Sequence, residues 1–443
     1  MGRGGVSFDL PNLPMGWEFA ALERCAIPGS ISYGVVQPGA PIAGGVAIIR
    51  VNNFKDMRLD LSDVMRIEAG IEAKYGRSRL AGGEVLLTLV GSVGQVAVVP
   101  KVCAGFNVAR AVGVIRPAGD IEAQWIAICL RSPLSQHLLA TRANTTVQTT
   151  INLKDVRALP IPIPPRVERQ QIAEFLYALD DRIALLRETN ATLEAIAHAL
   201  FKSWFVDFDP VRAKQQGLAP AGMDEATAAL FPDSFEESAL GLVPIGWRVG
   251  TLGDVSLNPR QGAKPENIPP EMPYFGLEHM PRRSIALASA GTAVGLESGK
   301  FWFERDDVLF GKLRPYFHKV GLAPTRGVCS TDILVVRPKG PSLLGFVVMH
   351  ASSDALIAHA TMLSNGARMP RTSWQDIAGF KVVLPPEEVA AAFNGVAYAL
   401  FERIYANIDA ARALSETRDT LLPRLISGQL RLPESQPMME SKP

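Results

Sequence analysis

The chain has 443 residues, of which 47% are hydrophobic and 20% charged, and its formal net charge is +1. This length is too great for one hydrophobic core and predicts two or three domains, while the composition excludes disorder as the dominant state. The most apolar stretch, residues 85–99, is interrupted by polar residues and glycines and falls short of the ~20 apolar residues that a membrane span needs. The N-terminus shows no apolar segment typical of a secretory signal, so we expect a soluble, cytoplasmic protein with no membrane partner.

The cysteines are few and scattered. None of Cys25, Cys103, Cys129 and Cys329 lies in a Cys-x-x-Cys pair or near a His partner. This spacing argues against a disulfide framework and a zinc site and fits a reducing cytoplasm. We therefore predict no metal site in this chain.

The small net charge conceals an alternation of basic and acidic segments. Residues 13–160 carry 15 Lys and Arg against 11 Asp and Glu, and residues 243–385 carry 16 against 11. Residues 166–242, which lie between them, carry 7 against 13. Only the two basic segments are therefore candidates for binding a polyanion.

The first basic segment predicts a small mixed α/β domain. It opens with Leu13-Pro14-Met15-Gly16-Trp17. Short β-rich runs follow at residues 85–90 and 95–99, and a helix is expected at residues 125–140. The loops between these elements are rich in Gly, Thr, Ser, Asn and Arg.

A long helix follows the proline pair at residues 164–165. From Glu168 to Phe205 apolar side chains recur at alternating steps of four and three, which is the 3.5-residue period of a coiled coil. Buried Asn in such a seam commonly fixes register, so Asn190 is assigned a structural role. The predicted seam contains Leu176, Leu179, Ile183, Leu186, Asn190 and Leu193.

After an acidic connector at residues 206–242 the pattern of the first half is repeated. The opening string returns as Val243-Pro244-Ile245-Gly246-Trp247, and the proline pair returns as Pro385-Pro386. β-rich runs recur at residues 308–310 and 333–336, and a helix is expected at residues 343–359. We infer an internal duplication.

The second long helix continues the coiled-coil period. Leu400 and Ile404 belong to its seam, and Asn407 and Arg418 are polar members. Pro423 is expected to kink or end the helix.

The offset between the two helices changes along their length. Arg182 matches Arg403 at an offset of 221 residues, whereas Glu188 matches Glu416 at 228. The difference of seven residues is one heptad, which predicts an insertion in the second helix. An insertion of this length would keep the apolar seam on the same face of the helix.

No motif for catalysis or cofactor binding is found. The chain lacks Gly-x-x-x-x-Gly-Lys-Ser/Thr, a Gly-x-Gly-x-x-Gly that follows a strand, and the Asn/Asp-Pro-Pro-aromatic tetrapeptide of amino-methyltransferases. A nucleophile elbow is also absent. We therefore predict no catalytic residue and no cofactor bound by this chain.

Polar clusters in the predicted loops of both basic segments are the candidate DNA-binding residues. Arg, Lys, Asn and Gln can make bidentate contacts to purine edges, whereas Lys and Ser/Thr more often hold phosphates. In the first segment the candidates are Tyr33, Gln37, Asn53, Lys55, Arg77, Arg79, Ser92, Gln95, Thr146 and Gln148. In the second they are Arg282, Arg283, Lys312, Arg314, Tyr316, His318, Lys319, Arg368 and Arg371.

Several ordered motifs together carry a family resemblance. They are the two Pro-x-Gly-Trp openings, residues 151–156 and 159–165, Glu168-Arg169-Gln170-Gln171-Ile172-Ala173, residues 200–214 (Leu-Phe-Lys-Ser-Trp-Phe-Val-Asp-Phe-Asp-Pro-Val-Arg-Ala-Lys), residues 371–374 and residues 421–428. Over nearly its whole length the chain resembles the specificity (S) subunit of type I restriction-modification systems. The second copy departs from the pattern at residues 387–391, Glu-Glu-Val-Ala-Ala, where the first copy has Glu-Arg-Gln-Gln. This departure puts the symmetry of partner contacts in doubt.

The resemblance implies an α+β fold with a pseudo-two-fold internal duplication. Two similar mixed α/β target-recognition domains would each be followed by a long helix, and the two helices would pack as an antiparallel coiled coil. The predicted boundaries are target-recognition domain 1 at 1–163, a central spacer helix at 164–205, the acidic connector at 206–242, target-recognition domain 2 at 243–385, a distal spacer helix at 386–432 and a disordered tail at 433–443.

The resemblance also implies a function and partners. Each domain would read one half of a bipartite, asymmetric site in double-stranded DNA, and the helices would set the spacing between the halves. Two modification (methyltransferase) subunits would dock on the helices and bring S-adenosylmethionine, and two restriction (motor-nuclease) subunits would bring ATP and Mg²⁺. The chain itself would be non-catalytic.

Three alternatives stay open at this point. The chain could be a coiled-coil scaffold that does not bind DNA, an enzyme with an unrecognised site, or a subunit that serves methylation alone. The sequence does not predict which bases would be read, because base readout depends on loop geometry.

Overall fold

The computed structural model describes residues 10–55, 57–143, 149–366 and 368–432. The chain forms two compact units, unit 1 from Met1–Ala184 with Leu414–Pro443 and unit 2 from Leu185–Ala413. Each of the two long helices, α5 (Arg166–Phe205) and α12 (Glu387–Ile426), therefore contributes to both units. The predicted domain boundaries keep each helix whole and stay a prediction.

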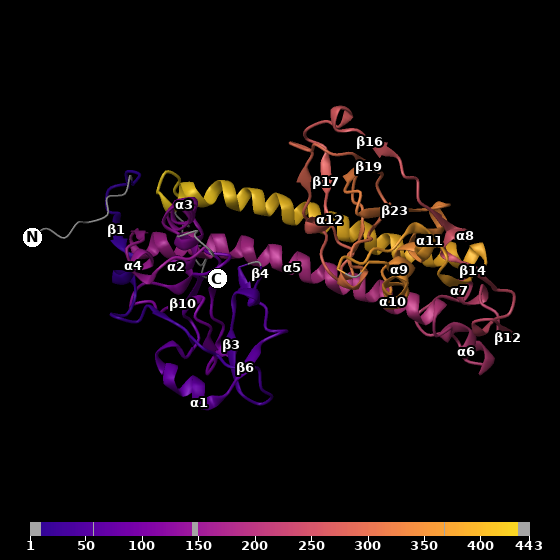
Figure 1. Cartoon of the computed structure of the whole chain (residues 1–443), viewed down its shortest axis with the longest axis horizontal. Helices are drawn as coiled ribbons and strands as arrows, with labels where there is room; N and C mark the ends of the chain where they lie inside the picture. The colour runs from indigo at the N-terminus through magenta and orange to yellow at the C-terminus, as the bar shows by residue number, and fades with distance from the viewer. Residues whose placement is uncertain (1–9, 56, 144–148, 367, 433–443) are drawn as a thin grey trace, which may run out of the picture. The chain divides into compact units, whose positions relative to one another are not determined.

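Unit 1 is a mixed α/β domain (Figure 1). Its central sheet has the order β2-β10-β7-β8, while β1 pairs with β11 and β6-β3-β9 form a second sheet. Its strands are β1 (Glu18–Ala21), β2 (Ser32–Tyr33), β3 (Val46–Ile49), β4 (Phe54–Lys55), β5 (Arg58–Leu59), β6 (Met65–Ile67), β7 (Val85–Thr88), β8 (Val96–Val98), β9 (Asn107–Val108), β10 (Val112–Ile115) and β11 (Pro160–Ile163). Its shorter helices are α1 (Ala69–Glu72), α2 (Ala123–Arg131), α3 (Pro133–Arg142) and α4 (Leu153–Arg157).

Unit 2 is a second mixed α/β domain. Its sheets have the orders β15-β23-β20-β21 and β16-β19-β22-β17-β18, with the two-stranded pairs β14-β24 and β12-β13. Its strands are β12 (Phe235–Ser238), β13 (Gly241–Pro244), β14 (Arg248–Thr251), β15 (Ser256–Leu257), β16 (Gly262–Ala263), β17 (Pro273–Phe275), β18 (Gly291–Thr292), β19 (Lys300–Phe303), β20 (Val308–Gly311), β21 (Val320–Leu322), β22 (Gly327–Cys329), β23 (Ile333–Pro338) and β24 (Lys381–Leu384). Its shorter helices are α6 (Asp209–Gln215), α7 (Glu225–Ala229), α8 (Leu252–Val255), α9 (Leu344–Ala351), α10 (Asp354–Leu363) and α11 (Trp374–Ala378).

The two units share a sheet topology. The four-stranded order β2-β10-β7-β8 corresponds strand for strand to β15-β23-β20-β21, and the pair β1-β11 corresponds to β14-β24. In each unit the equivalent strand, β7 or β20, pairs antiparallel with both of its neighbours. This agreement confirms the predicted internal duplication at the level of the fold.

The repeated Pro-x-Gly-Trp string forms the same turn in both units. The Trp17 amide donates to the Pro14 carbonyl over 3.1 Å, and the Trp247 amide donates to the Pro244 carbonyl over 3.0 Å. The glycine between them has a φ of +88° at Gly16 and +78° at Gly246. A side chain is disfavoured at such a position, which explains why glycine precedes the tryptophan in both copies.

The two tryptophans differ in their partners, and the departure at residues 387–391 removes the partner that the first copy supplies. The Trp17 indole donates to Glu168 over 3.1 Å. Glu168 belongs to the Glu-Arg-Gln-Gln string, whose next residue, Arg169, is 2% exposed and donates to Glu122 over 2.7 Å. The second copy lacks this string, and the buried Trp247 indole nitrogen has no hydrogen-bond partner among the described residues.

The helices predicted at residues 125–140 and 343–359 are each broken into two. Ser132 separates α2 from α3, and its hydroxyl accepts a hydrogen bond from the Ser135 amide over 3.2 Å. Ser353 separates α9 from α10 and accepts from the Leu356 amide over 3.1 Å. In both cases a serine with extended backbone geometry caps the second helix. The sequence prediction followed the apolar periodicity instead and overlooked this signal.

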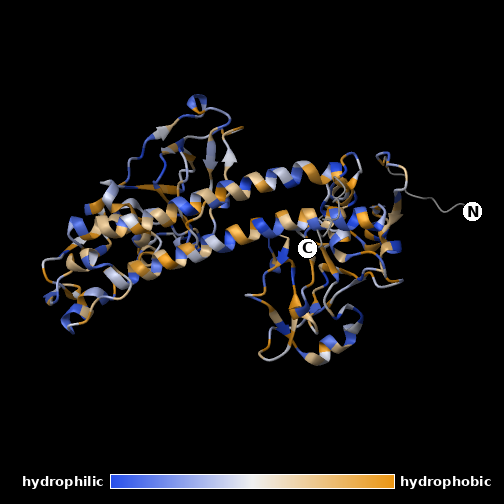
Figure 2. Cartoon of the chain, turned by 180° about the vertical axis from the view of Figure 1, so that it is seen from behind, coloured by the Kyte–Doolittle hydropathy of each residue, from blue (hydrophilic) through white to orange (hydrophobic). Residues whose placement is uncertain are grey.

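The long helices form an antiparallel pair within each unit. In unit 1 Asp180 of α5 contacts Arg418 of α12 over 2.9 Å, and Glu168 contacts Arg431 just beyond the end of α12 over 3.6 Å. In unit 2 Asn407 donates to Asn190 over 2.8 Å, and the two asparagines are 2% and 6% exposed. Hydrophilic and hydrophobic residues alternate along both helices in Figure 2.

Most members of the predicted seam are buried in the structure. Leu176, Ile183, Leu186, Asn190 and Ile404 are buried. The remaining predicted members, Leu179, Leu193 and Leu400, are partly buried.

The prediction of a heptad insertion is wrong. Both helices have 40 residues, and they begin and end at the same offset of 221. Pro423 lies in the last turn of α12, which ends at Ile426.

The core of unit 2 includes both long helices and the connector. Phe201 and Phe205 of α5 pack with Phe346 of α9 and Phe393 of α12, with ring centroids 5.0–6.1 Å apart. The acidic connector is folded, because Phe208, Val211 and Phe231 are buried in this same core. Aromatic packing of this kind stabilises beyond the area that it buries.

No single helix among the described residues is long and apolar enough to cross a membrane. The segments Pro341–Ala351 and Asp354–Leu363, bent by 66° at the break between them, pass that test of length and composition only as a pair. Every residue of α9, within the first segment, is buried in unit 2.

Candidate nucleic-acid interface

The basic candidates of unit 2 come together at the connection between β20 and β21. This connection packs on the segment that precedes α11 through backbone hydrogen bonds. The Arg314 amide donates to the Pro370 carbonyl over 2.8 Å, and the Thr372 amide donates to the Lys312 carbonyl over 3.0 Å. Residues more than 50 positions apart in the sequence are thereby placed side by side.

A third segment, around Arg282, joins the same place. The Arg283 amide donates to the His318 carbonyl over 2.9 Å, and the Arg282 guanidinium lies 4.1 Å from the centroid of the Phe317 ring. The nine predicted residues of unit 2 thus lie on three contacting segments, which we call the unit 2 loop cluster: Arg282, Arg283, Lys312, Arg314, Tyr316, His318, Lys319, Arg368 and Arg371.

The backbone of the unit 2 loop cluster is held in a conformation that side chains disfavour. Arg283, Arg314 and His318 have φ angles of +55°, +50° and +51°. Such residues cost of order 1–3 kcal/mol each and persist only where surrounding contacts over-determine them, and they gather at functional sites. Between Arg314 and His318 the chain makes a single 3-10 turn that leaves the Tyr316 side chain 51% exposed.

Carboxylates hold several of the cationic groups in place. Arg371 contacts Asp332 over 3.3 Å, and Arg283 contacts Asp354 over 2.9 Å. The Lys312 amide also donates to the Asp332 carbonyl over 2.9 Å. The cluster is therefore shaped before any ligand arrives.

Two of the side chains predicted to contact DNA in unit 2, those of His318 and Lys319, already have hydrogen-bond partners within the unit. His318 is 6% exposed, and its Nε2 lies 2.9 Å from the Ser352 carbonyl. Burial, reinforced by the nearby Arg283 charge, lowers the pKa of His318. Lys319 donates from Nζ to the Leu277 carbonyl, and burial lowers its pKa as well. We therefore remove His318 from the set of direct DNA contacts, since a buried imidazole presents no edge to a base.

Unit 1 uses the equivalent pair of loops. Val90, after β7, forms an isolated bridge with Thr150, as Leu313 after β20 does with Arg371, and the Gly91 amide donates to the Thr149 carbonyl over 2.9 Å. Ser92 and Gln95 lie on this β7–β8 connection and are exposed. The predicted Thr146 and Gln148 lie outside the described residues.

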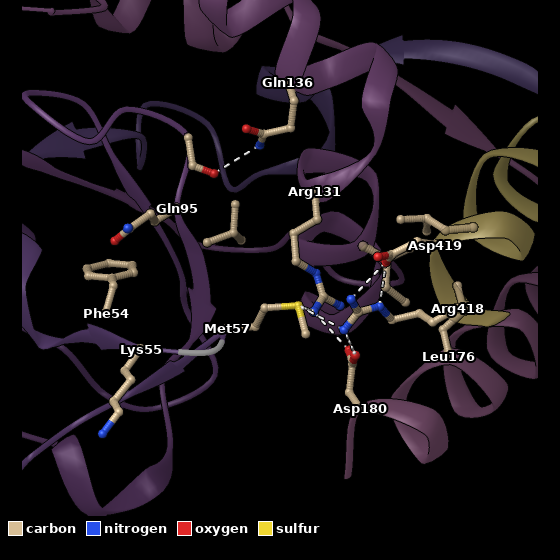
Figure 3. Close-up of a pocket in the computed structure, with 14 residues that line it drawn as sticks. Phe54, Lys55, Met57, Gln95, Arg131, Gln136, Leu176, Asp180, Arg418 and Asp419 are labelled. Carbon is tan, nitrogen blue, oxygen red and sulfur yellow. Dashed lines mark hydrogen bonds and ion pairs between the residues drawn. The ribbon is translucent and has the colours of Figure 1, made fainter. Parts of the chain in front are cut away.

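Lys55 and Gln95 line a cavity of about 400 Å³ in unit 1 (Figure 3). On the opposite wall Asp180 contacts Arg131 and Arg418, each over 2.9 Å, and Figure 3 shows Lys55 pointing away from these ion pairs. The ion pairs join α2 to the two long helices, and Met57, between β4 and β5, contacts Arg131. We interpret this network as structural support for the loops beside it.

The other candidates of unit 1 lie in different places. Asn53 is 2% exposed and donates to the Asp60 and Asp63 carbonyls, so we also remove it from the direct contacts. Arg79 is bonded to Glu72 over 2.9 Å, and Arg116 donates to the carbonyls of Arg77 and Arg79.

Two further candidates of unit 1 are exposed. The Tyr33 hydroxyl accepts from the Leu153 amide over 3.2 Å, while the ring stays 40% exposed. Gln37 is exposed.

Sequence reasoning missed two residues that support these contacts. Asp332 and Asp354 pair with cationic side chains of the unit 2 loop cluster, yet each looks like an ordinary loop or cap residue in the sequence. Their role depends on pairing between distant segments, which no local pattern reveals. Among the described residues, no group of three His, Cys, Asp or Glu side chains is placed to hold a metal ion.

Comparison with known proteins gives consistent matches. Residues 43–195 match the family described as type I restriction modification DNA specificity domain. The EcoBI specificity subunit of Escherichia coli is 34% identical over 225 residues, which cover 48% of this chain and about half, 46%, of that relative's length. The HindI specificity subunit of Haemophilus influenzae is 26% identical over 66% of this chain and 72% of that relative, and the MjaIX specificity subunit of Methanocaldococcus jannaschii is 22% identical over 80% and 78%.

A solved structure shares the fold. The crystal structure of the type I restriction-modification S subunit from M. genitalium aligns over 97% of this chain and 99% of that one, with a TM-score of 0.53 and 14% identity. The class defined by the fold is a duplicated protein of two mixed α/β units that share a pair of long antiparallel helices. The chain therefore shares the fold of that S subunit, and its residues 43–195 match a type I restriction modification DNA specificity domain.

Proposed function

We propose that this chain is the DNA-recognition subunit of a type I restriction-modification complex, in which each unit reads one half of a bipartite, asymmetric site. One observation carries this proposal. The connection after β7 bears Ser92 and Gln95, the equivalent connection after β20 bears Lys312, Arg314 and Tyr316, and each pairs with the segment before α4 or α11. A duplicated reading surface matches a site with two separate halves.

The shared helices support a second part of the proposal. Because α5 and α12 each contribute to both units, they would set the spacing between the two half-sites. The exposed aliphatic residues Leu185 and Ile196 of α5 and Val396 of α12 are suited to contact partner proteins. Two methyltransferase subunits would dock on these helices.

Catalysis would belong to the partners. Methyltransferase subunits would bring S-adenosylmethionine for adenine methylation, and two motor-nuclease subunits would bring ATP and Mg²⁺ for translocation and cleavage. This chain would bind no cofactor, and the complex would act on chromosomal and invading DNA in the cytoplasm.

The test is adenine-methylation mapping of host DNA by single-molecule sequencing, with and without this gene. We expect a bipartite motif that disappears with the gene and therefore supplies both half-sites. An unchanged methylation pattern, with the methyltransferase subunit shown to be expressed, would contradict the proposal and favour a scaffold or an enzyme.

A further inference from the structure

Glu194 of α5 is a buried carboxylate that the proposed reading mechanism does not use. It is 6% exposed within unit 2, and burial raises its pKa. Burying a charge without a cation costs several kcal/mol unless hydrogen bonds compensate it. A carboxylate kept at such a position therefore needs an explanation beyond packing.

Three donors from a single short segment satisfy this carboxylate. Ser284 donates from its hydroxyl over 2.8 Å, and the amides of Ile285 and Ala286 donate over 2.9 and 3.2 Å. Hydrogen bonds to an ionised carboxylate are about twice as strong as neutral ones. Glu194 thus holds the loop segment 284–286 against α5.

The fixed segment continues directly into the unit 2 loop cluster. Arg282 and Arg283 precede it, and the Leu322 amide of β21 donates to the Ile285 carbonyl over 2.9 Å. Arg283 in turn bonds to the His318 carbonyl, so the segment is held both by the helix and by the loop that carries Tyr316. A continuous path of hydrogen bonds runs from α5 to the predicted base-reading residues.

A cavity of about 480 Å³ lies beside this segment, although Ile285 itself is packed in the core of unit 2. Its lining includes Glu194, His198 and Lys202 of α5 together with Arg283, Ser284 and Ile285. Open space beside the segment leaves room for it to move if the carboxylate is removed. The hydrogen bonds of Glu194 therefore act together with the Arg283–His318 bond to place Arg282 and Arg283.

We propose that Glu194 is a positioning residue for DNA readout: it holds residues 282–286 on α5, so that base discrimination by unit 2 depends on this helix. The inference rests on the proposed DNA-recognition function and deepens it. It assigns a role in specificity to a spacer-helix residue that need not touch DNA itself.

The experiment uses the full chain with its partner subunits in a host whose own methylation at the site is absent. Adenine methylation is mapped for the unchanged chain, Glu194→Ala, Glu194→Gln and the control Glu174→Gln, which alters an exposed glutamate of the same helix. Arg371→Ala alters a predicted DNA contact of unit 2, so the half of the motif that it relaxes is the half that unit 2 reads. The thermal melting temperature of each purified chain is recorded alongside.

We expect Glu194→Ala to raise methylation at sites mismatched in the unit 2 half, relative to the cognate sequence, by roughly tenfold. Discrimination in the other half should stay unchanged. Glu194→Gln keeps the volume and one acceptor oxygen, so it should give an intermediate relaxation of the same half, and it carries the test if Glu194→Ala fails to fold. Glu174→Gln should leave the motif intact.

A different pattern would overturn the inference. If the Glu194 variants lower methylation equally at all sites while the motif keeps its full specificity, the residue serves stability only. If the unchanged chain itself directs no bipartite motif, the proposed function fails and the inference fails with it.

Discussion

Arg282 and Arg314 both place their guanidinium groups over the Phe317 ring, at 4.1 and 5.8 Å from its centroid. Arg371 is similarly held against Asp332. Side chains fixed in this way lose less conformational entropy on binding than free ones, so they can contribute more of their interaction energy to DNA affinity. At the scale of single residues, the reading surface of unit 2 is therefore preorganised.

Replacing Lys312 and Arg314 by alanine should weaken DNA binding by removing phosphate contacts. Each lost contact should reduce the slope of log affinity against log salt by about 0.9, so the double variant should lose about two. The measurement is a binding titration with duplex DNA at a series of salt concentrations. Lys264→Ala with Lys381→Ala, two exposed lysines outside the unit 2 loop cluster, serves as the control and should leave the slope unchanged. An unaltered slope in the Lys312 and Arg314 variant would instead favour the scaffold that does not bind DNA.

His350 should make unit 2 sensitive to acid. Burial lowers the pKa of its imidazole from the ordinary 6.5 to about 3, and its Nε2 has no partner among the described residues. Between these two values the unfolded chain binds one more proton than the folded chain, so stability falls as the pH falls below 6.5, by about 1.4 kcal/mol per pH unit. His350→Phe should remove this loss and gain about 2 kcal/mol over the unchanged chain at pH 5.

Chemical denaturation at pH 5 and pH 8 checks this prediction. The gain from His350→Phe should be larger at pH 5, because only there does the unfolded histidine bind its extra proton. His137→Phe, which removes an exposed histidine of unit 1, is measured in parallel. A gain that is independent of pH would show that His350 does not titrate between the two states.

At the scale of elements, the helix pair is specified by its seam and by two polar layers. In unit 2 the layer is Asn190 with Asn407, and in unit 1 it is Asp180 with Arg418 and Arg131. A polar group in a seam costs stability but penalises every register in which it lacks its partner. The structure confirms the sequence prediction that Asn190 is buried in the seam, and it identifies Asn407, the polar member predicted in the second helix, as its partner.

Asn407→Leu alone should destabilise the protein by about 1–3 kcal/mol, because it leaves the buried side-chain oxygen of Asn190 without its hydrogen-bond donor. The double replacement of Asn190 and Asn407 by leucine should recover most of this loss or exceed it. A double-mutant cycle by denaturant unfolding measures the coupling between the two positions. Additive single effects would show that the 2.8 Å hydrogen bond contributes nothing to the pairing.

Lengthening both helices by one heptad should change the spacing of the recognised site. Seven residues add ~10 Å at a rise of about 1.5 Å per residue, which corresponds to about three base pairs of DNA. Methylation mapping should then show both half-sites unaltered and the gap between them longer by about three base pairs. As a control, a heptad inserted in α5 alone should impair assembly, because it breaks the equal length of the helices. A motif with its original gap would rule out the helices as the spacer.

At the scale of the whole molecule, the duplication joins two similar units in one chain, and under the proposed function each unit would read its own half of an asymmetric site. The four-stranded sheets correspond, but the second sheets differ, with three strands in unit 1 and five in unit 2. The candidate side chains also differ, with Ser92 and Gln95 in unit 1 where unit 2 has a run of basic and aromatic residues. Equal frameworks with unequal loops are what two different half-sites require.

Much of this architecture could be predicted from local patterns in the sequence. The seam from Leu176 to Leu193 follows from a 3.5-residue period, and the duplication follows from the repeated Pro-x-Gly-Trp string. Both signals act over a few residues, so they survive without knowledge of distant contacts. The split of the predicted helices at Ser132 and Ser353 was missed because a capping serine is a weaker signal than a continuous apolar run.

The sequence by itself determined the duplication, the two long helices with their seam and the basic character of both units. Only the tertiary structure decided that the segments carrying Arg282, Lys312 and Arg371 come together. It also decided that Asn53 and His318 are buried and that Glu194 holds the segment 284–286. The physical reason is the distance along the sequence over which each interaction acts. Helix periods and turns depend on neighbours a few residues away, whereas burial and loop proximity depend on strand pairing and packing between segments tens of residues apart.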